Sequence, residues 1–586
     1  MLHHVLEQPL RSAVLGVLPD ALPESILVRP CPDPKFGDYQ STSLMSLAKE
    51  RKLNPRQLAG DVVCRLDVSA WCEKVDIAGP GFLNFRLKTE AVAKVLQEGG
   101  TGEHLFFEKT ATPRTIVVDF SSPNVAKPMH VGHIRSTILG DSLARTLRLL
   151  GHHVITDNHI GDWGTQFGKL LVGWKEQLDR AALKRAPLAE MERLYKTIDA
   201  ASKNDPAVLE RARQELVKLQ AGDEENRAIW REMFALSQHQ FESIYARLGV
   251  KFDQQLGESF YNPHLKQVVE DLRSKGIARE SEGAICVFSE GTLPPKQDPF
   301  MIEKEGQWQP NPAIIQKRDG AANYTTTDLA TLAYRLATWK PGEIVYVTDG
   351  RQQLHFQQLF AIFRRWNPSA PVKLAHVWFG SILGEDGRPF RTREGETIKL
   401  ADLLDEAEER AFRVVSEKNP ELSEPERREI ARVVGIGAVK YSDLLPNRQS
   451  DYVFSWDKML ALNGNTVPYL LYAYARIRSI FRKGEITADQ LSSSAVQLST
   501  SEEIGLARHL LNFGFVLEAV AEEYRPNYLC TYLYETAGHF ARFFEACPVL
   551  KSEGLTRSTR LVLCDLTGRV LKEGLTVLGI QTLEQM

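Results

Sequence analysis

Hydrophobic and polar positions in the middle of the chain follow two different periods, and together they predict a nucleotide-binding unit. An apolar, β-branched run over 115–120 is typical of a strand buried in a parallel sheet. A polar segment with two prolines follows it, and leucines then recur at helical spacing up to Gly151. A second short strand is expected over 154–156. Strand, loop, helix and strand in this order form half of a dinucleotide-type fold, with the loop at a helix N-terminus that favours anions.

A second unit of strand, helix and strand is expected over 344–380, where the strands are placed at 344–347 and 376–379. Between the two units, the residues from 169 to about 250 are charged and locally amphipathic without any catalytic spacing, which predicts a helical insertion. We therefore predict a multidomain α/β protein with a small N-terminal α+β domain (1–112), a Rossmann-like parallel-sheet catalytic domain (113–400, with a helical insertion at about 170–255), a helical connecting region (401–460) and a C-terminal all-α helical bundle (461–586).

Composition limits the function classes. The chain has 586 residues, enough for three or four domains, and it is 43% apolar and 25% charged. The net charge of −3 means that any nucleic-acid surface must be a local patch. Seven scattered cysteines without a C-x-x-C pair indicate reduced thiols in a cytoplasm, without structural zinc. No signal peptide is evident, and we expect no apolar run of membrane-spanning length.

The loop after the first strand lacks the usual phosphate-binding glycines. No G-x-G-x-x-G follows that strand, and the Gly-Lys pair at 168–169 is not followed by Ser or Thr. The loop contains His130 and His133 instead, with Gly132 between them. Both imidazoles can project from one face of a first helical turn towards a phosphate, and Gly132 leaves room for a flat base. The alternatives are two surface histidines or a zinc pair, although no further ligand stands at finger-like spacing.

Two strings around this loop carry a family resemblance. FSSPNVAKPMHVGHIRST, which begins at Phe120, and GDWGTQFG, which begins at Gly161, resemble the signature of class I arginyl-tRNA synthetases. The resemblance extends over nearly the whole chain. It implies ATP-dependent joining of L-arginine to tRNA(Arg) through an arginyl-adenylate, with Mg²⁺ carried by the nucleotide, in a cytoplasmic enzyme that is a monomer and does not bind membranes.

Tyr324 and Asp328 begin a helix and allow two interpretations. Asp328 could complete a capping box, which is a common use of an acid near a helix start. Alternatively, the two side chains converge across one helical turn on a guanidinium, which needs planar acceptors. The resemblance implies the second role, and it implies that Asp119 and Asn124 hold the α-amino end of the substrate. The arginine-binding residues implied are Asp119, Asn124, Glu282, Tyr324, Asp328 and Gln352.

The resemblance also implies an ATP site. Its residues are His130, Gly132, His133, His355, Phe379, Phe390, Arg391 and Thr392. His355 could instead be a satisfied core histidine. The loop at 390–393 stands where class I synthetases have a Lys-Met-Ser-Lys-Ser-type loop, but it has no lysine.

Lys127 is the lysine nearest to the two histidines, and in the family a lysine at this place substitutes for the missing loop lysine. We therefore predict His130, His133, Lys127 and Arg391 as catalytic residues. The alternative for Lys127 is a solvent-facing lysine at a helix entrance.

Contacts with tRNA are expected at both ends of the chain. In the N-terminal domain, Asn84 matches the family position nearest to the base-reading edge, or it merely faces solvent on a strand. The start of the C-terminal helices resembles the anticodon-binding bundle of the family. There Arg476 and Arg478 stand among tyrosines that suit phosphate contact and base stacking, although a solvated helix face explains the same charges.

Two other functions stay open at this point. A small-molecule nucleotidyltransferase could have a related two-histidine loop, but such enzymes are much shorter and lack the C-terminal bundle. A synthetase-like RNA-binding paralogue without catalysis is disfavoured by the intact histidines, Asn124, Tyr324 and Asp328.

Overall fold

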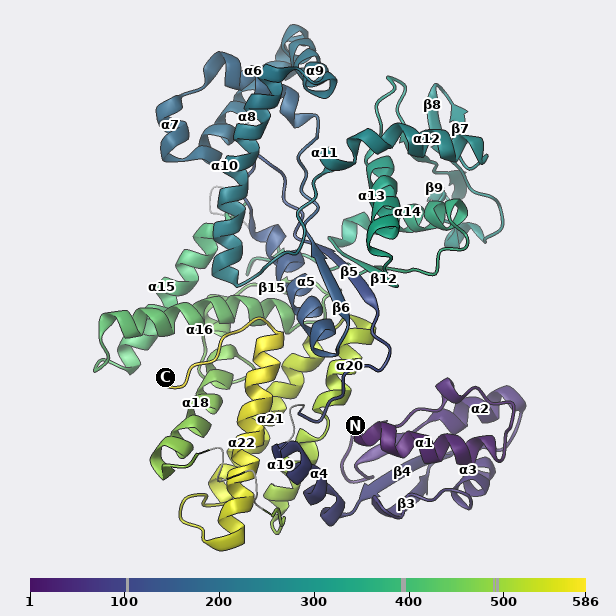
Figure 1. The fold of residues 1–586 in the computed structure, drawn as a ribbon, viewed down its shortest axis with the longest axis vertical. Coiled ribbons are helices and arrows are strands. Elements are labelled where there is room, and N and C mark those ends of the chain that lie inside the picture. Colours follow the sequence, from purple (N-terminus) through teal and green to yellow (C-terminus); the bar gives the residue numbers. More distant parts are fainter. Residues whose placement is uncertain (102–104, 391–396, 488–490, 492–494) are drawn as a thin grey trace. The chain divides into compact units, whose positions relative to one another are not determined.

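The computed structural model describes residues 1–101, 105–390, 397–487, 491 and 495–586 (Figure 1). Contacts divide the chain into two compact units. One comprises residues 111–414 and 442–456 and is called the catalytic unit below, because it contains the residues expected to be catalytic. The other comprises 1–110, 415–441 and 457–586 and is called the tRNA unit below, because it contains the residues expected to contact tRNA. The domain limits that the sequence suggests at 112, 400 and 460 stay predictions.

A four-stranded parallel sheet forms the centre of the catalytic unit. Its order is β13-β12-β5-β6, with β5 at Thr115–Phe120, β6 at His153–Asp157, β12 at Glu343–Val347 and β13 at Lys373–His376. The parallel-sheet prediction is confirmed. The strand expected at 376–379 lies three residues earlier, because the chain leaves the sheet after His376. Every residue of β12 is buried, as expected for a strand covered on both faces.

Helices α5 (Val131–Leu149), α13 (Tyr324–Trp339) and α14 (Gln353–Trp366) accompany this sheet. A Cβ atom on Gly140 of α5 would lie 2.2 Å from the Phe120 ring. The helix therefore approaches β5 closely only because this position has no side chain.

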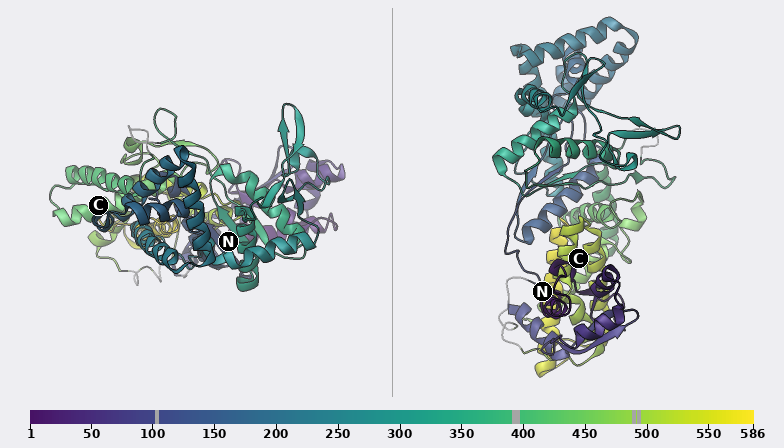
Figure 2. Two further views of the ribbon diagram at one scale, coloured as in Figure 1. Left: turned by 90° about the horizontal axis from the view of Figure 1, so that it is seen from above. Right: turned by 90° about the vertical axis from the view of Figure 1, so that its right-hand side faces the viewer.

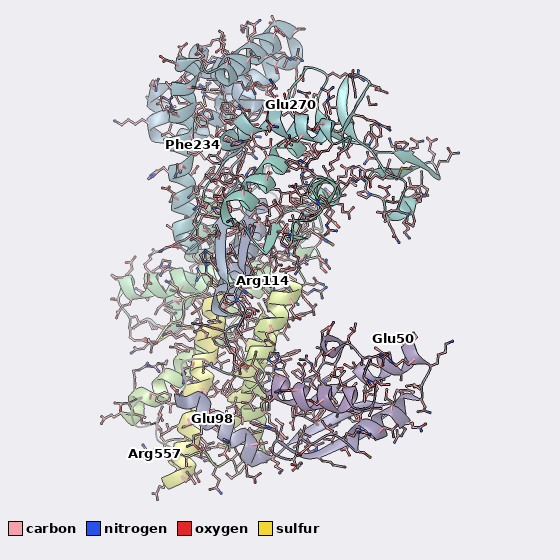
Figure 3. All side chains as sticks on the ribbon, turned by 45° about the vertical axis from the view of Figure 1, so that its right-hand side comes forward. Glu50, Glu98, Arg114, Phe234, Glu270 and Arg557 are labelled. Carbon is pink, nitrogen blue, oxygen red and sulfur yellow. The ribbon has the colours of Figure 1, made fainter. Side chains whose placement is uncertain are left out.

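The segment between β6 and α13 folds into two parts. The predicted helical insertion is α6 (Gln166–Gln177), α7 (Arg180–Arg185), α8 (Pro187–Asn204), α9 (Pro206–Ala221) and α10 (Glu224–Leu248), gathered in a cluster of their own (Figure 2). The second part contains α11 (Glu258–Tyr261), η2 (Asn262–His264), α12 (Leu265–Ser274), β7 (Arg279–Ser281), β8 (Ala284–Val287), η3 (Pro295–Gln297), β9 (Met301–Lys304), β10 (Gln307–Pro310) and β11 (Ala313–Gln316). Phe234 on α10 and Glu270 on α12 mark the two parts in Figure 3.

After β13 the chain passes through β14 (Ile382–Leu383), α15 (Leu400–Lys418), α16 (Glu424–Leu444), β15 (Tyr452–Val453) and α17 (Trp456–Met459). Arg135 of α5 ties this region to the sheet. Its guanidinium donates to the carbonyl oxygens of Gly380 at 2.7 Å and Ser450 at 3.2 Å, and it pairs with Asp443 at 3.0 Å. Both partners of the ion pair are buried.

The tRNA unit combines the two ends of the chain. At the N-terminus are α1 (Leu2–Leu15), η1 (Pro23–Ser25), β1 (Arg29–Pro30), β2 (Tyr39–Ser41), α2 (Ser43–Arg51), α3 (Pro55–Val63), β3 (Cys72–Ala78), β4 (Phe82–Leu87) and α4 (Thr89–Thr101). The strands form an antiparallel sheet of order β1-β2-β4-β3, so the α+β prediction is confirmed. The C-terminal bundle is α18 (Val467–Gly484), α19 (Ser501–Leu510), α20 (Phe513–Glu523), α21 (Asn527–Ala546) and α22 (Gly554–Val577). Arg508 and Asp38 join the two parts through an ion pair of 3.2 Å.

One expectation about the sequence needs correction. The stretch Ser501–Glu523 is long and apolar enough to cross a membrane by length and composition alone. The structure divides it into α19 and α20, whose apolar residues, including Leu506, Phe513 and Leu517, are buried among the other bundle helices. Its apolar character is therefore explained by the bundle core.

Candidate functional site

The loop that follows β5 has an unusual backbone. Ser121, Ser122 and Ala126 have φ angles of 75°, 49° and 62°, in the left-handed region that residues other than glycine rarely adopt. Hydrogen bonds hold all three: Ser121 N–H donates to Ser136 Oγ, Ser122 N–H to Asn158 Oδ1, and Ala126 N–H to Ser237 Oγ, at 2.8, 3.1 and 2.9 Å. Strain that is fixed in this way is characteristic of functional loops.

His130 and His133 are held by the same helix start. The Gly132 N–H donates to His130 Nδ1 and the His130 N–H donates to His133 Nδ1, both at 3.1 Å, and the ring centroids are 4.1 Å apart. Since each Nδ1 accepts a backbone hydrogen bond, the proton of each neutral imidazole belongs on Nε2. The loop therefore provides two N–H donors whose tautomers are set by the backbone.

Both imidazoles are neutral at neutral pH. Burial lowers the pKa of His130, and the positive charges of Lys127 and Arg351 lower it further. Burial, followed by the neighbouring His130, lowers the pKa of His133 to about 3. The two rings can consequently bind an anion through hydrogen bonds rather than as cations.

The backbone at Ile398 and Leu400 lies beside the start of the histidine helix. Val131 N–H donates to the Ile398 carbonyl and Leu400 N–H donates to the Met129 carbonyl, both at 2.9 Å. Phe390 stacks on Phe454 with ring centroids 4.5 Å apart. Two of the predicted ATP contacts, Arg391 and Thr392, lie outside the described residues.

A second group of side chains surrounds Asp328 on α13. His355 Nε2 lies 2.5 Å from Asp328 Oδ2, and the Tyr324 ring contacts the His355 ring at 4.8 Å with its own side chain largely exposed (61%). The N-cap of α13 is Asn323, and the structure shows no capping box there. The capping interpretation of Asp328 is therefore wrong, and His355, expected on the ATP side, contacts the residues expected on the arginine side.

Glu258 at the start of α11 is a site residue that the sequence reasoning missed. Burial raises the pKa of this carboxyl, His159 opposes the rise, and the carboxylates of Asp162 and Asp328 add to it, which places Glu258 near Asp328. Asp162 fixes the turn, because its two oxygens accept from Ser259 N–H at 2.8 Å and Ser259 Oγ at 2.6 Å.

The turn at Glu258 also depends on Gly257. A Cβ atom there would lie 2.5 Å from the Asp162 carboxylate. The contact of this turn with Asp162 is tertiary, so the sequence alone gave no signal for Glu258.

The resemblance implies that Glu282 binds the arginine side chain, but in the structure Glu282 lies in a solvent-exposed turn. It occupies the turn between β7 and β8 with a φ of 51°, its side chain is 82% exposed, and it pairs with Arg318 at 2.8 Å. No described contact joins Glu282 to Asp328, so the structure gives this assignment no support, and it stays a prediction. Glu282 precedes the short strand β8, and a single sequence does not show where in the fold such a strand lies.

Asp119 is buried at the carboxyl end of β5 and faces Arg335 of α13. Arg335 Nη2 lies 2.6 Å from Asp119 Oδ2 and 2.8 Å from Asp157 Oδ2, and the Arg335 side chain is fully buried. Ser122 Oγ donates to Asp119 Oδ1 at 3.3 Å. Asp119 is therefore part of a buried triad of charges, in which Oδ2 pairs with Arg335 and Oδ1 accepts from Ser122.

Three other predicted residues differ in exposure. Asn124 is exposed, and its carboxamide covers Gly161, where a Cβ atom would lie 2.3 Å from Asn124 Oδ1. Gln352 is exposed in the short helix η4 (Gly350–Gln352). Phe379 is buried under the Arg135 guanidinium, 5.6 Å from its ring centre, which is a packing role.

The residues predicted to contact tRNA have different environments in the structure. Asn84 is buried, and its carboxamide oxygen accepts a hydrogen bond from Gln40 at 2.7 Å. Its side chain therefore neither faces solvent nor offers an open edge for reading a base. Arg478 pairs with Glu584 at 2.7 Å. Arg476 stacks over the rings of Tyr472 and Phe544 at 4.8 and 5.4 Å.

Arg476 lies beside an open cavity in the bundle. The cavity has a volume of about 700 Å³, and its lining includes two aromatic rings and four cationic side chains, Tyr472, Phe544, Arg476, Arg482, Lys483 and Lys551. Aromatic and basic groups in one cavity suit single-stranded nucleic acid.

The described residues contain one group of three side chains that could hold a metal ion, His3, His4 and Glu518. This group belongs to the tRNA unit, whereas the nucleotide loop belongs to the catalytic unit.

An open parallel sheet, a loop at its carboxyl edge with two histidines at a helix start, and a separate all-helical C-terminal bundle define a class I aminoacyl-tRNA synthetase. Three family profiles match consecutive parts of the chain. They are the arginyl tRNA synthetase N terminal domain at residues 2–87, the class I (R) tRNA synthetase catalytic domain at 92–456 and the DALR anticodon binding domain at 470–586. The chain belongs to the arginyl-tRNA synthetase family.

Similar proteins agree with this assignment. The arginine–tRNA ligase of Synechococcus sp. is 47% identical over 570 residues, which are 96% of this chain and 95% of that protein. The ligase of Salmonella enteritidis is 48% identical over 94% of both chains. The crystal structure of arginyl-tRNA synthetase from Plasmodium falciparum matches with a TM-score of 0.83 and 28% identity, covering 100% of this chain and 99% of the other. The Thermus thermophilus arginyl-tRNA synthetase matches with the same TM-score, 26% identity and full coverage of both chains.

Proposed function

We propose that this chain charges tRNA(Arg) with L-arginine in two steps, and that the side chains around Asp328 and the two histidines divide the chemistry between them. The observation that carries this proposal is the contact of His355 with both Asp328 and Tyr324, together with the carboxylate of Glu258, which interacts electrostatically with Asp328. Two carboxylates and a phenol suit a guanidinium, which needs planar acceptors and a compensating charge.

Asp328 and Glu258 hold the guanidinium of the substrate, and His355 orients the Asp328 carboxylate. The 2.5 Å contact between His355 and Asp328 supports that orienting role. Tyr324, which is largely exposed, closes over the ligand. The α-amino group of arginine binds to Asn124 and Gln352, and to Asp119 through Oδ1, because Oδ2 is occupied by Arg335.

In the first step an oxygen of the arginine carboxylate attacks the α-phosphorus of MgATP. The bond from that phosphorus to the bridging oxygen breaks, and pyrophosphate leaves with the electron pair and the magnesium ion. The Nε2–H groups of His130 and His133 donate to the phosphate oxygens as negative charge builds there. Lys127 and Arg391 bind the departing pyrophosphate, and Gly132 leaves a flat surface for the adenine ring.

In the second step a terminal hydroxyl of the tRNA attacks the carbonyl carbon of the adenylate and AMP leaves. The bundle binds the tRNA at the cavity beside Arg476, where aromatic rings and cations lie together. Arg478 orders the C-terminal residues through Glu584 rather than contacting RNA.

We also propose that the enzyme works as a monomer in the cytoplasm without a membrane. The seven cysteines are all free thiols, which is consistent with a reducing compartment. Sedimentation of the purified protein, alone and with tRNA, tests the monomer, and a 2:2 complex would contradict it.

The experiment that tests the activity is ATP–pyrophosphate exchange with each of the twenty amino acids, with and without tRNA(Arg), followed by transfer to the tRNA. We expect exchange and transfer with arginine alone. Tight tRNA binding without exchange would indicate a non-catalytic RNA-binding protein. Adenylate formation without transfer to tRNA would indicate a small-molecule nucleotidyltransferase.

A further inference from the structure

Helix α8 of the insertion brings an aromatic ring to Lys127. Lys127 Nζ lies 5.3 Å from the centre of the Tyr195 ring, and Lys169 Nζ lies 6.0 Å from the same centre. Both distances are within the range of a cation–π interaction. A ring from the insertion therefore holds a cation that belongs to the nucleotide loop.

The two lysines differ in their other partners. Lys169 Nζ lies 2.5 Å from Asp199 Oδ1, one helical turn after Tyr195 on α8. In the described part of the chain, no carboxylate lies within ion-pair distance of Lys127, whose side chain is exposed. Asp199 thus neutralises one lysine, while the other meets only the ring face.

Lys127 also faces the site. Its backbone is confined between Ala126, with a φ of 62°, and Pro128, which limits the directions open to its side chain. Its positive charge contributes to the low pKa of His130, so the ammonium acts electrostatically on the ring expected to contact ATP.

We infer that Tyr195 is a positioning residue for adenylate formation, and that the helical insertion takes part in catalysis by aiming Lys127 at the polyphosphate. The reasoning rests on the role proposed for Lys127. A carboxylate would fix a lysine equally well, but it would compete with the phosphate for the ammonium group. A ring attracts the cation without a counter-charge, so the full positive charge remains available to the anion that arrives.

The tyrosine hydroxyl has no part in this arrangement. Among the described residues it has no hydrogen-bond partner, so only the ring face matters for the interaction with Lys127. Phenylalanine should therefore replace Tyr195, whereas leucine, which is apolar but smaller and has no π system, should not.

The test is arginine-dependent ATP–pyrophosphate exchange, in the presence of tRNA, with full-length Tyr195→Phe, Tyr195→Leu, Lys127→Met and the double variant Tyr195→Leu/Lys127→Met. Lys169→Met is the matched control, because it removes a lysine near the same ring that already has its carboxylate. Thermal unfolding of each variant checks that the fold is kept.

We expect Tyr195→Leu to lower kcat by about threefold to thirtyfold with an unchanged KM for arginine. Tyr195→Phe and Lys169→Met should stay within about twofold of the parent enzyme, and Tyr195→Leu should add no further loss to Lys127→Met. Equal losses in Tyr195→Phe and Tyr195→Leu, or full additivity in the double variant, would overturn the inference.

The experiment distinguishes the role of Lys127 from the role of Tyr195. If Lys127→Met is costly and Tyr195→Leu is harmless, the role of Lys127 stands and that of Tyr195 is refuted. If Lys127→Met is itself harmless, the proposed role of Lys127 is refuted and the inference about Tyr195 is refuted with it.

Discussion

Replacing Arg335 with methionine tests the buried charges beneath the site. Arg335 is fully buried between Asp119 and Asp157, at 2.6 and 2.8 Å, and both carboxylates are buried as well. Methionine keeps most of the volume but removes the only cation that contacts both acids in the described structure. Breaking a buried ion pair from one side costs about 3–5 kcal/mol, and here two acids lose their partner, so we expect a loss near the upper end.

The loss should depend on pH with a definite sign. Burial already raises the pKa of Asp119 in spite of Arg335, and without the guanidinium the rise must be larger. A carboxyl whose pKa is raised in the folded state binds more protons folded than unfolded. Its folded state therefore loses stability as the pH rises through the window between the two pKa values. Relative to the parent, Arg335→Met should recover as the pH falls from 7.5 to 5.5, by roughly 1.4 kcal/mol per pH unit for each carboxyl that takes up a proton.

The assay is urea unfolding at several pH values, followed by tryptophan fluorescence. Asp119→Asn/Asp157→Asn/Arg335→Met is the control, because removing all three charges together should restore much of the stability that Arg335→Met loses. A cost below about 1 kcal/mol at pH 7.5, or a cost that does not change with pH, would refute the view that this triad is a desolvated ionic network.

Three further predictions concern single side chains. His130→Gln, whose amide nitrogen reaches the position of Nε2, should keep pyrophosphate exchange within about tenfold, whereas His130→Asn, whose amide reaches only Nδ1, should lose about 10²–10³-fold; equal losses in both would contradict the assigned tautomer. Asp328→Asn should raise the arginine KM by at least tenfold and leave ATP affinity unchanged, since the guanidinium then has one carboxylate partner instead of two; an arginine KM within threefold would refute its role. Gly140→Ala should destabilise by about 1–3 kcal/mol because its Cβ would lie 2.2 Å from Phe120, whereas Gly60→Ala, with nothing within 4 Å, should stabilise slightly in thermal unfolding; the reverse order would contradict the packing described.

Local patterns predicted the elements of the catalytic unit well. The strands at 115–120, 154–156 and 344–347 are found within a residue, because a strand buried on both faces leaves an apolar run between polar ends. The pair His130 and His133 was also evident, because its geometry depends on a single helical turn. Such features can be predicted because the residues that determine them lie within about ten positions of one another in the sequence.

Partners distant in the sequence could not be predicted in this way. Glu258 interacts electrostatically with Asp328, whereas Glu282 is exposed and pairs with Arg318, yet both are acids before short elements, and only the packing of α11 against Asp162 distinguishes them. Asn84 looked accessible on a strand, but its neighbour across the sheet, Gln40, engages it. The hydrogen-bond partner of a side chain often comes from a distant part of the sequence, so it depends on the tertiary structure.

The directions of the pKa shifts indicate how the site handles two substrates of opposite charge. Burial lowers the pKa of His130, and the charges of Lys127 and Arg351 lower it further, whereas burial raises the pKa of Glu258 and the carboxylates of Asp162 and Asp328 add to that rise. Cations therefore gather where a polyphosphate would bind, and acids gather where a guanidinium would bind. A charged histidine at the reacting phosphate would be repelled by those cations. Neutral imidazoles avoid that repulsion, and their Nε2–H groups still donate to the charge that develops in the transition state. The low pKa of each histidine results first from burial, and for His130 also from the neighbouring cations, and it keeps both rings neutral for this role.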